Sequence, residues 1–293
     1  MQTKSLSLME VLAAGQRLLK AAGVESARLD CELLLCSVLQ CERHHLYLMG
    51  DKPLDAEKHR RFEGLLSRRL KGEPVQYILG KREFMGLEFY VDKSVLIPRF
   101  ETEILVEYVI YAIGRRKASI LDLGTGSGAI SVSLAVYLPE AHVVAIDISR
   151  EALEVAGKNA DRHKVASRID FIESDMFEAL EGDGFPHCFD AVVSNPPYIR
   201  SGDIQGLMRE VRDFEPISAL DGGADGLDFY REIACKAFRF LKPGGFVAVE
   251  MGYDQSACVR EIFKGTGKYA EERILKDLSG IDRVAVFYKH DKE

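Results

Sequence analysis

The sequence predicts an α/β protein in which a small helical bundle and a short linker precede a larger domain built on a mostly parallel sheet. Residues 5–72 carry apolar residues at helical spacing and no strand-like run. From Ser119 onward, short apolar runs alternate with helical segments, which is typical of parallel strands joined by helices. We therefore expect a helical domain at 1–73, a linker containing a β-hairpin at 74–97, and the main domain at 98–293.

The composition is that of an ordinary globular protein. Of the 293 residues, 47% are hydrophobic and 29% are charged, which suits a domain with a full core. The formal net charge of −7 argues against a dominant electrostatic grip on nucleic acid, so we expect no stable nucleic-acid binding. No stretch has the length of a membrane span, and the first residues lack a hydrophobic signal core. We expect a cytoplasmic protein without a membrane partner.

The six cysteines do not indicate a metal site. They are scattered, and none lies in a Cys-x-x-Cys pair. Cysteines of this kind are usually buried small hydrophobic residues, so we expect no bound metal.

Helices are predicted throughout the first domain. Gly23 is a plausible stop for the first helix, and Ser26 is expected to cap the second. Asp55 is expected to cap the fourth helix, which Gly72 closes. We interpret the basic residues of the fourth helix as a solvated face, with a partner surface, including one for RNA, as the alternative. They are Lys58, Arg60, Arg61, Arg68, Arg69 and Lys71. Since this domain holds no catalytic constellation, we expect it to recognise the substrate.

The linker has two recognisable parts. The stretch from Pro74 to Gly80 is expected to run from a turn into extended backbone, and Phe84 to Val91 reads as two short strands around Gly86. Thr102 or Glu101 is then expected to begin the next helix.

The main domain is predicted to alternate strands and helices. The expected strands are Ile120–Leu123, Val143–Ile146, Ile169–Ile172, Ala191–Val193, Phe246–Glu250 and Val284–Tyr288. The expected helices lie at about 129–138, 150–162, 225–241 and 254–264. A mostly parallel sheet with helices on both faces follows, and ligands bind such folds at the carboxyl ends of the strands.

A glycine-rich turn opens the first helix of this domain. Gly124-Thr-Gly-Ser-Gly128 follows the strand Ile120–Leu123, and glycines let the backbone approach a ligand closely. Asp147 ends the next strand, where a carboxylate can accept both hydroxyls of a ribose. A nucleoside cofactor is favoured over a merely tight turn.

Acidic residues distinguish between cofactors. The G-x-G-x-G pattern fits the dinucleotide fingerprint imperfectly, and Asp122 precedes it, where a carboxylate would face a cation better than a pyrophosphate. S-adenosylmethionine carries a sulfonium and an ammonium and no phosphate. Asp175 could accept its adenine amino group, with Met176 against the ring.

The stretch Asn195-Pro-Pro-Tyr198 ends the short apolar run Ala191–Val193. Proline fixes its own φ and holds the preceding residue extended. The Asn195 carboxamide, the Pro196 carbonyl, the rigid Pro197 and the Tyr198 ring together suit a planar group that carries an NH2. The alternative is a turn that leaves a strand and nothing more.

These motifs resemble the release-factor glutamine methyltransferases, the PrmC/HemK family. The resemblance rests on the glycine loop, Asp147, Ser174-Asp175, Asn195–Tyr198 and the helical front half. Further matching segments are Pro74–Gly80, Ile97–Glu103, Glu215-Pro216, Ala219–Gly223, Asp225–Leu227 and Leu241–Gly245. It spans residues 5–290, nearly the whole chain.

The resemblance implies a class I S-adenosylmethionine-dependent methyltransferase with a seven-stranded, Rossmann-like sheet. It implies methyl transfer to the side-chain nitrogen (N5) of the glutamine in the Gly-Gly-Gln motif of class 1 peptide chain release factors, which act in translation termination. The implied catalytic residues are Asn195, Pro196 and Tyr198, and the implied substrate-binding residues are Asn195, Pro196, Pro197 and Tyr198. The cofactor residues are Gly124, Thr125, Gly126, Ser127, Gly128, Asp147, Asp175, Met176 and Asn195. Two positions depart from the family: Met176 replaces a frequent aromatic residue, and Phe100 replaces a usual proline.

Other functions fit parts of the pattern. An adenine-N6 DNA or guanine-N2 RNA methyltransferase would also use Asn-Pro-Pro-Tyr, but such enzymes need a basic cleft to grip the phosphate backbone. A nucleotide-responsive binding protein would not need the turn at Asn195-Pro196-Pro197, which we call the Asn195 corner. A dehydrogenase would need the third glycine at dinucleotide spacing.

Overall fold

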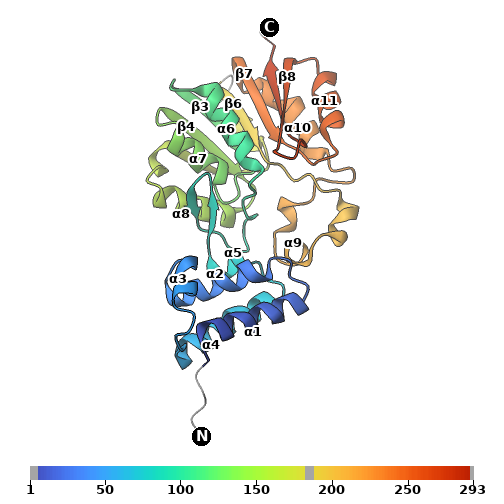
Figure 1. The fold of residues 1–293 in the computed structure, drawn as a ribbon. Helices are drawn as coiled ribbons and strands as arrows, with labels where there is room; N and C mark the ends of the chain where they lie inside the picture. The colour runs from blue at the N-terminus through green and yellow to red at the C-terminus, as the bar shows by residue number, and fades with distance from the viewer. Residues whose placement is uncertain (1–5, 182–187, 291–293) are drawn as a thin grey trace. The chain divides into compact units, whose positions relative to one another are not determined.

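The computed structural model describes residues 6–181 and 188–290, which fall into two compact units. Unit 1 consists of Met1–Gly80 together with Met208–Phe214, and unit 2 of Lys81–Leu207 and Glu215–Glu293. The chain therefore passes from one unit to the other after Gly80, after Leu207 and after Phe214. Figure 1 shows the helices before Gly80 in blue to cyan, α9 in yellow-orange, and the sheet of unit 2 from green to red.

Unit 1 is a helical bundle with a core of its own, in which Leu12, Leu34 and Phe62 are buried together. Asp55 caps α4 as expected, since its carboxylate accepts a hydrogen bond from the Lys58 backbone N–H. Ser26 occupies the N-cap position of α2, but the expected side-chain cap is wrong, because its hydroxyl makes no capping bond. The helices are α1 Leu8–Ala21, α2 Ala27–Leu39, α3 Arg43–Leu48, α4 Ala56–Leu70, α5 Val75–Leu79 and α9 Arg209–Arg212.

Two expectations for unit 1 are corrected. The stretch after Pro74 is the short helix α5 and not extended backbone, because Val75, Tyr77 and Ile78 bury their side chains by making a helical turn. Arg69 does not belong to a solvated basic face, since it is only 4% exposed. Its guanidinium lies 2.6 Å from Asp30 Oδ2 and 2.6 Å from Glu210 Oε2.

Unit 2 carries a hairpin and a seven-stranded sheet. The hairpin pairs β1 with β2 through Phe84 and Leu87, as predicted for the linker. Its strands and those of the sheet are β1 Arg82–Phe84, β2 Leu87–Phe89, β3 Ala118–Leu123, β4 Ala141–Asp147, β5 Ile169–Glu173, β6 Phe189–Ser194, β7 Leu241–Glu250, β8 Tyr269–Lys276 and β9 Asp282–Lys289. The helices are α6 Thr102–Ile113, α7 Ala129–Tyr137, α8 Arg150–Arg162, α10 Asp228–Lys236 and α11 Ser256–Gly265. The 3-10 helices are Ala166–Arg168, Glu178–Leu180, Ser201–Gly206, Ile217–Ala219 and Ala237–Arg239.

The sheet has the strand order β5-β4-β3-β6-β7-β9-β8. The pairs from β5 to β7 are parallel, whereas β9 runs antiparallel to both β7 and β8. This confirms the predicted mostly parallel sheet. The sequence does not predict the edge strand β8, because charged residues interrupt the stretch from Tyr269 to Lys276 and leave no apolar run or alternation.

Alternating strand residues bury the two faces of the sheet under different helices. Ile120 and Val143 pack in one core with α6, α7 and α8, whereas Leu121 and Val144 pack in the other with α10 and α11. Helices cover both faces, as predicted (Figure 1). Because helices cover both faces, a ligand is expected to bind at the carboxyl ends of the central strands. Within the described ranges, no helix has the length and apolarity required to cross a membrane.

Candidate functional site

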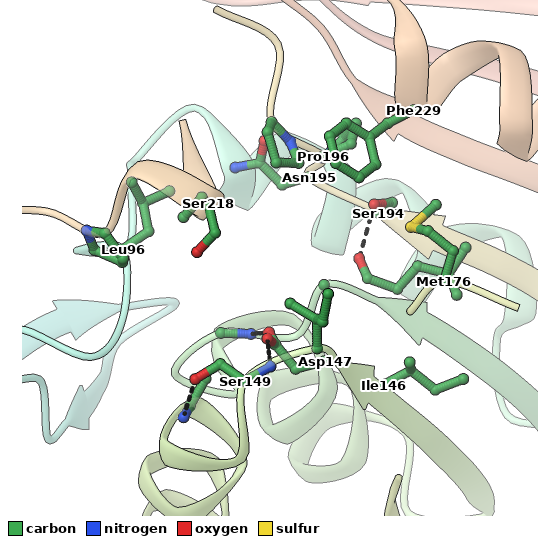
Figure 2. A pocket seen from close by; sticks show the side chains of 18 of the residues that line it. Leu96, Ile146, Asp147, Ser149, Met176, Ser194, Asn195, Pro196, Ser218 and Phe229 are labelled. Atoms are coloured by element: carbon green, nitrogen blue, oxygen red, sulfur yellow. Dashed lines mark hydrogen bonds between the residues drawn. The ribbon is translucent and has the colours of Figure 1, made fainter. Parts of the chain in front are cut away.

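A cavity of about 530 Å³ lies at the carboxyl ends of the central strands of unit 2 (Figure 2). Leu123 of β3, Asp147 of β4 and Ser194 of β6 line it, and so does Met176 beyond the end of β5. The order of the strands reverses between β3 and β6. Open α/β sheets bind their ligands at such a reversal.

The glycine-rich loop contributes backbone to this cavity. Gly124 and Gly126 line it, and both have positive φ, 70° and 56°. Side chains disfavour this region, so glycine allows the loop to turn sharply beside a ligand. Gly128 is the N-cap residue of α7, and a Cβ there would lie 3.1 Å from the Ala156 Cβ. Its role in the structure is close packing of α7 against α8.

Two expected cofactor contacts face the protein interior. Thr125 is buried, and its hydroxyl donates a 2.7 Å hydrogen bond to Asp122 Oδ2. Ser127 is buried as well, and its carbonyl accepts a 2.8 Å bond from Asn159 Nδ2. In the described structure neither residue lines the cavity, and nor does Gly128. These residues fix the shape of the loop from behind.

Asp147 projects into the cavity with both oxygens already oriented. Its Oδ2 accepts a 2.8 Å bond from the Gly126 N–H, and its Oδ1 accepts a 2.9 Å bond from the Ser149 N–H. Burial raises the pKa of Asp147 against the opposing effect of these donors. A carboxylate has about four acceptor positions on its two oxygens. Each oxygen therefore retains capacity for a ligand hydroxyl.

A second carboxylate, Asp122, lies fully buried behind the loop. Its Oδ2 is bonded to Thr125 and to the Ser131 N–H, but among the described residues its Oδ1 has no partner. Burial raises the pKa of Asp122 to about 7, and the charge of Asp147 adds to the increase. A cationic ligand would stabilise both carboxylates, whereas a pyrophosphate would not. The residues present fit a ligand that carries a positive charge and a ribose.

Asp175 and several apolar residues complete the wall of the cavity beside Asp147. Asp175 and the buried Met176 line it as expected. Phe229 of α10 and Ile148 also line it, although the sequence does not indicate a site role for either. Figure 2 shows the Phe229 ring beside Pro196. Phe229 sits on an amphipathic helix whose apolar residues read as core, and Ile148 could have been noticed only from its place next to Asp147.

The Asn195 corner lies on the side of the cavity facing Asp147 (Figure 2). The hydroxyl of Ser194 donates a 2.7 Å bond to the Leu123 carbonyl, which ties the end of β6 to the end of β3. Asn195, Pro196 and Pro197 line the cavity. The Asn195 Nδ2 donates a 3.1 Å bond to Thr102 Oγ1.

Tyr198 is placed differently from the other three residues of its motif. It lines a neighbouring cavity of about 480 Å³, together with Arg200 and Tyr253, and is absent from the lining described for the first cavity. Its ring packs against the core under α10 and α11. Burial raises its pKa. The four residues therefore divide between two adjacent cavities.

The loop that contains Gly222 and Gly226 packs against the residues that follow Asn195-Pro-Pro. The Gly222 N–H donates a 2.8 Å bond to the Ile199 carbonyl. A Cβ on Gly226 would lie 2.5 Å from the Tyr198 carbonyl oxygen. The side chain of Gln255 donates to the carbonyls of both Tyr198 and Gly226, at 2.9 and 3.1 Å. Nothing in the local sequence of Gln255 indicates this role.

Phe100, which departs from the usual proline, is 59% exposed. The guanidinium carbon of Arg82 lies 4.1 Å from its ring centroid. The Phe100 ring therefore lies on the surface of unit 2, against the Arg82 side chain.

Comparison with known families matches two parts of the chain. Residues 10–80 match the model described as the PrmC N-terminal domain. Residues 115–280 match a model described as a methyltransferase domain.

Curated relatives match nearly the whole chain. A release factor glutamine methyltransferase from Geobacter sulfurreducens is 46% identical, over 95% of each chain. One from Moorella thermoacetica is 41% identical, over 98% of this chain and 100% of the relative. Among solved structures, a methyltransferase from Pyrococcus furiosus is similar in fold, with a TM-score of 0.50 and 18% identity over 78% of this chain and 98% of the other.

Proposed function

We propose, since the chain belongs to the family of release factor glutamine methyltransferases, that it methylates the side-chain amide nitrogen of the glutamine in the Gly-Gly-Gln motif of class 1 release factors. Its methyl donor is S-adenosyl-L-methionine. The observation that carries the proposal is a cavity with an amide corner, Asn195-Pro196, facing a ribose-type acid, Asp147.

The cofactor side follows from the carboxylates and the loop. We propose that Asp147 accepts the ribose hydroxyls, that the Gly124 and Gly126 backbone lies against the cofactor, and that Asp175 and Met176 meet the adenine. When bound, S-adenosyl-L-methionine supplies a methyl group on a positively charged sulfur. The acidic character of Asp122 and Asp147 supports a cationic ligand here.

The substrate side addresses a weak nucleophile. A carboxamide nitrogen is poorly nucleophilic because its lone pair is delocalised into the carbonyl. We propose that Asn195 Oδ1 and the Pro196 carbonyl accept the two N–H groups of the substrate amide and so orient its nitrogen. The rigid Pro197 holds this geometry. No residue of the cavity is required as a strong base, so catalysis is chiefly positioning.

Tyr198 has a modified role in this proposal. Because it lines the neighbouring cavity, we propose that this second cavity receives the polypeptide on either side of the substrate glutamine. The aromatic ring beside the Asn195 corner is that of Phe229.

Unit 1 is proposed to recognise the release factor. It has a core of its own and carries exposed basic residues on α4, among them Lys58, Arg60 and Arg61. A protein that modifies translation factors is expected to work in the cytoplasm. The DNA and RNA methyltransferase alternative is not favoured, because the relatives are named for glutamine methylation.

The test is methyl transfer from labelled S-adenosylmethionine to three substrates in parallel. They are a purified class 1 release factor, the same factor with its Gly-Gly-Gln glutamine changed to alanine, and a mixture of DNA and RNA. We expect label on the first alone, placed on the glutamine by peptide mass spectrometry. Label on nucleic acid, or equal label on both protein substrates, would reject the proposal.

A further inference from the structure

Asn195 is the first member of a chain of hydrogen bonds that leads into the protein. Its Nδ2 donates to Thr102 Oγ1 at 3.1 Å, and Thr102 Oγ1 donates to Glu250 Oε2 at 2.5 Å. Thr102 is the first residue of α6 and Glu250 the last of β7, and they are only 4% and 1% exposed. Side chains from α6, from β7 and from the turn that follows β6 are therefore joined by hydrogen bonds.

The hydroxyl of Thr102 determines which groups donate and which accept along these hydrogen bonds. A hydroxyl has one proton to donate and two lone pairs that accept. An ionised Glu250 can only accept, so it takes the Thr102 proton and leaves the hydroxyl oxygen to accept from Asn195. The Nδ2 of Asn195 must then face Thr102. In the described part of the chain no group donates to the other polar atom of this amide, Oδ1.

We propose that Thr102 and Glu250 are positioning residues that fix the direction of the Asn195 carboxamide, so that its oxygen meets the NH2 of the substrate. This inference rests on the proposed function of Asn195. The reverse arrangement would present Nδ2 to the substrate nitrogen, and two NH2 groups cannot form a hydrogen bond with each other.

The charge of Glu250 controls the arrangement. A protonated carboxyl can donate to Thr102, which frees the hydroxyl proton for Asn195 Oδ1 and favours the reversed amide. Burial, with a smaller contribution from Glu101, raises the pKa of Glu250 to about 7 against the lowering effect of the Thr102 bond, Arg283 and Arg99. Titratable and charged groups face Glu250 from each element around it: Arg99, Glu101, Tyr198, Tyr230 and Arg283.

The experiment measures single-turnover methyl transfer to a release factor at saturating cofactor, from about pH 5.5 to 9. Thr102→Val removes the middle of the chain, and we expect a loss of about tenfold or more in rate with cofactor affinity unchanged. Thr102→Ser keeps the hydroxyl and should restore most of the rate. Tyr108→Phe is the matched control, because it removes a different buried hydroxyl from α6, one bonded to Tyr288.

Glu250→Gln separates charge from shape. The parent should lose rate as the pH falls through about 7, because Glu250 becomes protonated. Glutamine has no titrating proton and can either donate or accept, so this variant should lose part of its rate equally at every pH and lack the acid limb. If the limb persists in Glu250→Gln, another group such as Asp122 causes it and the inference is wrong. The same holds if a folded Thr102→Val enzyme stays within about threefold of the parent.

A second readout does not depend on turnover. The side-chain NH2 signal of Asn195 in a nitrogen-15 NMR spectrum, identified by its absence in Asn195→Ala, should shift with pH near 7 in the parent and stay constant in Glu250→Gln. A signal that ignores pH in the parent contradicts the inference, even where no methylation is detected. Absence of methylation in the parent contradicts the proposed function instead.

Discussion

The two sides of the cavity are built in opposite ways. On the cofactor side, the donors are backbone N–H groups, those of Gly126 and Ser149, which are 21 and 2 positions from the carboxylate they hold, Asp147. On the substrate side, Asn195 depends on the side chains of Thr102 and Glu250, which are 93 and 55 positions away in the chain. The first side uses backbone donors from adjacent strand ends, and the second uses side chains from distant parts of the sequence. Changes on the first side should alter affinity, and changes on the second should alter rate.

Asn195→Ala should have the largest effect of these changes, and it should act on the rate of methyl transfer. Loss of one preorganised acceptor at the substrate nitrogen is expected to lower the single-turnover rate by about 10²-fold or more. The Pro-Pro turn sets the backbone, so the melting temperature and cofactor affinity should change little. A folded Asn195→Ala enzyme within about threefold of the parent rate would remove this residue from the mechanism.

Asp147→Ala should break the cofactor side. Two charge-assisted hydrogen bonds of about 1.5–3 kcal/mol each are lost, so calorimetry should show affinity for S-adenosylmethionine reduced well over tenfold. Asp170→Ala is the matched control, because it makes the same change at an exposed residue of the neighbouring strand β5. Equal affinities for the two variants would refute the ribose assignment.

Gly226→Ala tests whether packing of the Gly226 loop against Tyr198 determines the geometry of the substrate side. Its Cβ would lie 2.5 Å from the Tyr198 carbonyl at a φ of 76°, and overpacking of this kind typically costs about 1–3 kcal/mol. Gly280→Ala has a similar φ of 81° but no atom within 4 Å. The difference between the two variants isolates the close contacts of the added Cβ with Tyr198 and Gln255. We expect Gly226→Ala to lower the rate and leave cofactor affinity unchanged. Equal melting temperatures for the two variants would contradict a role for this packing.

The mildest expected effect is a dependence of stability on pH. The pKa of Glu250 is raised from its usual 4.5 to about 7 in the folded protein. The folded state therefore holds the proton more tightly than the unfolded chain. The resulting stabilisation is complete below about pH 4.5 and is lost as the pH rises through about 7. Denaturant titrations of the parent and Glu250→Gln should diverge over this range, and parallel curves would contradict the raised pKa.

The contrast between the two sides also explains what could be predicted. The alternation of strands and helices, the hairpin and the loop from Gly124 to Gly128 are local patterns, and the sequence indicates them correctly. Asp147 was expected beside the loop because strand ends of a parallel sheet meet at one edge. The structure indeed joins it to Gly126.

What could not be predicted depends on distant pairs. Gln255 bonds to Tyr198, 57 residues away, and Thr102 to Glu250, 148 residues away. Each of these side chains reads locally as an ordinary surface or capping residue. Tyr198 was expected to face the same cavity as Asn195, but its position is decided by packing under α10 and α11. Likewise, the burial of Arg69 is decided by Asp30 and Glu210.

The segment Met208–Phe214 limits how this protein can be rearranged by evolution or by engineering. It lies between two stretches of the catalytic chain, yet it belongs to the helical unit, where Arg69 holds Glu210 as well as the buried Asp30. A recombination event at Gly80 alone would bring in a new helical unit but leave behind the loop that completes it. The helical unit is therefore inherited in two pieces, and a relative's version can be grafted intact only if residues 208–214 travel with it.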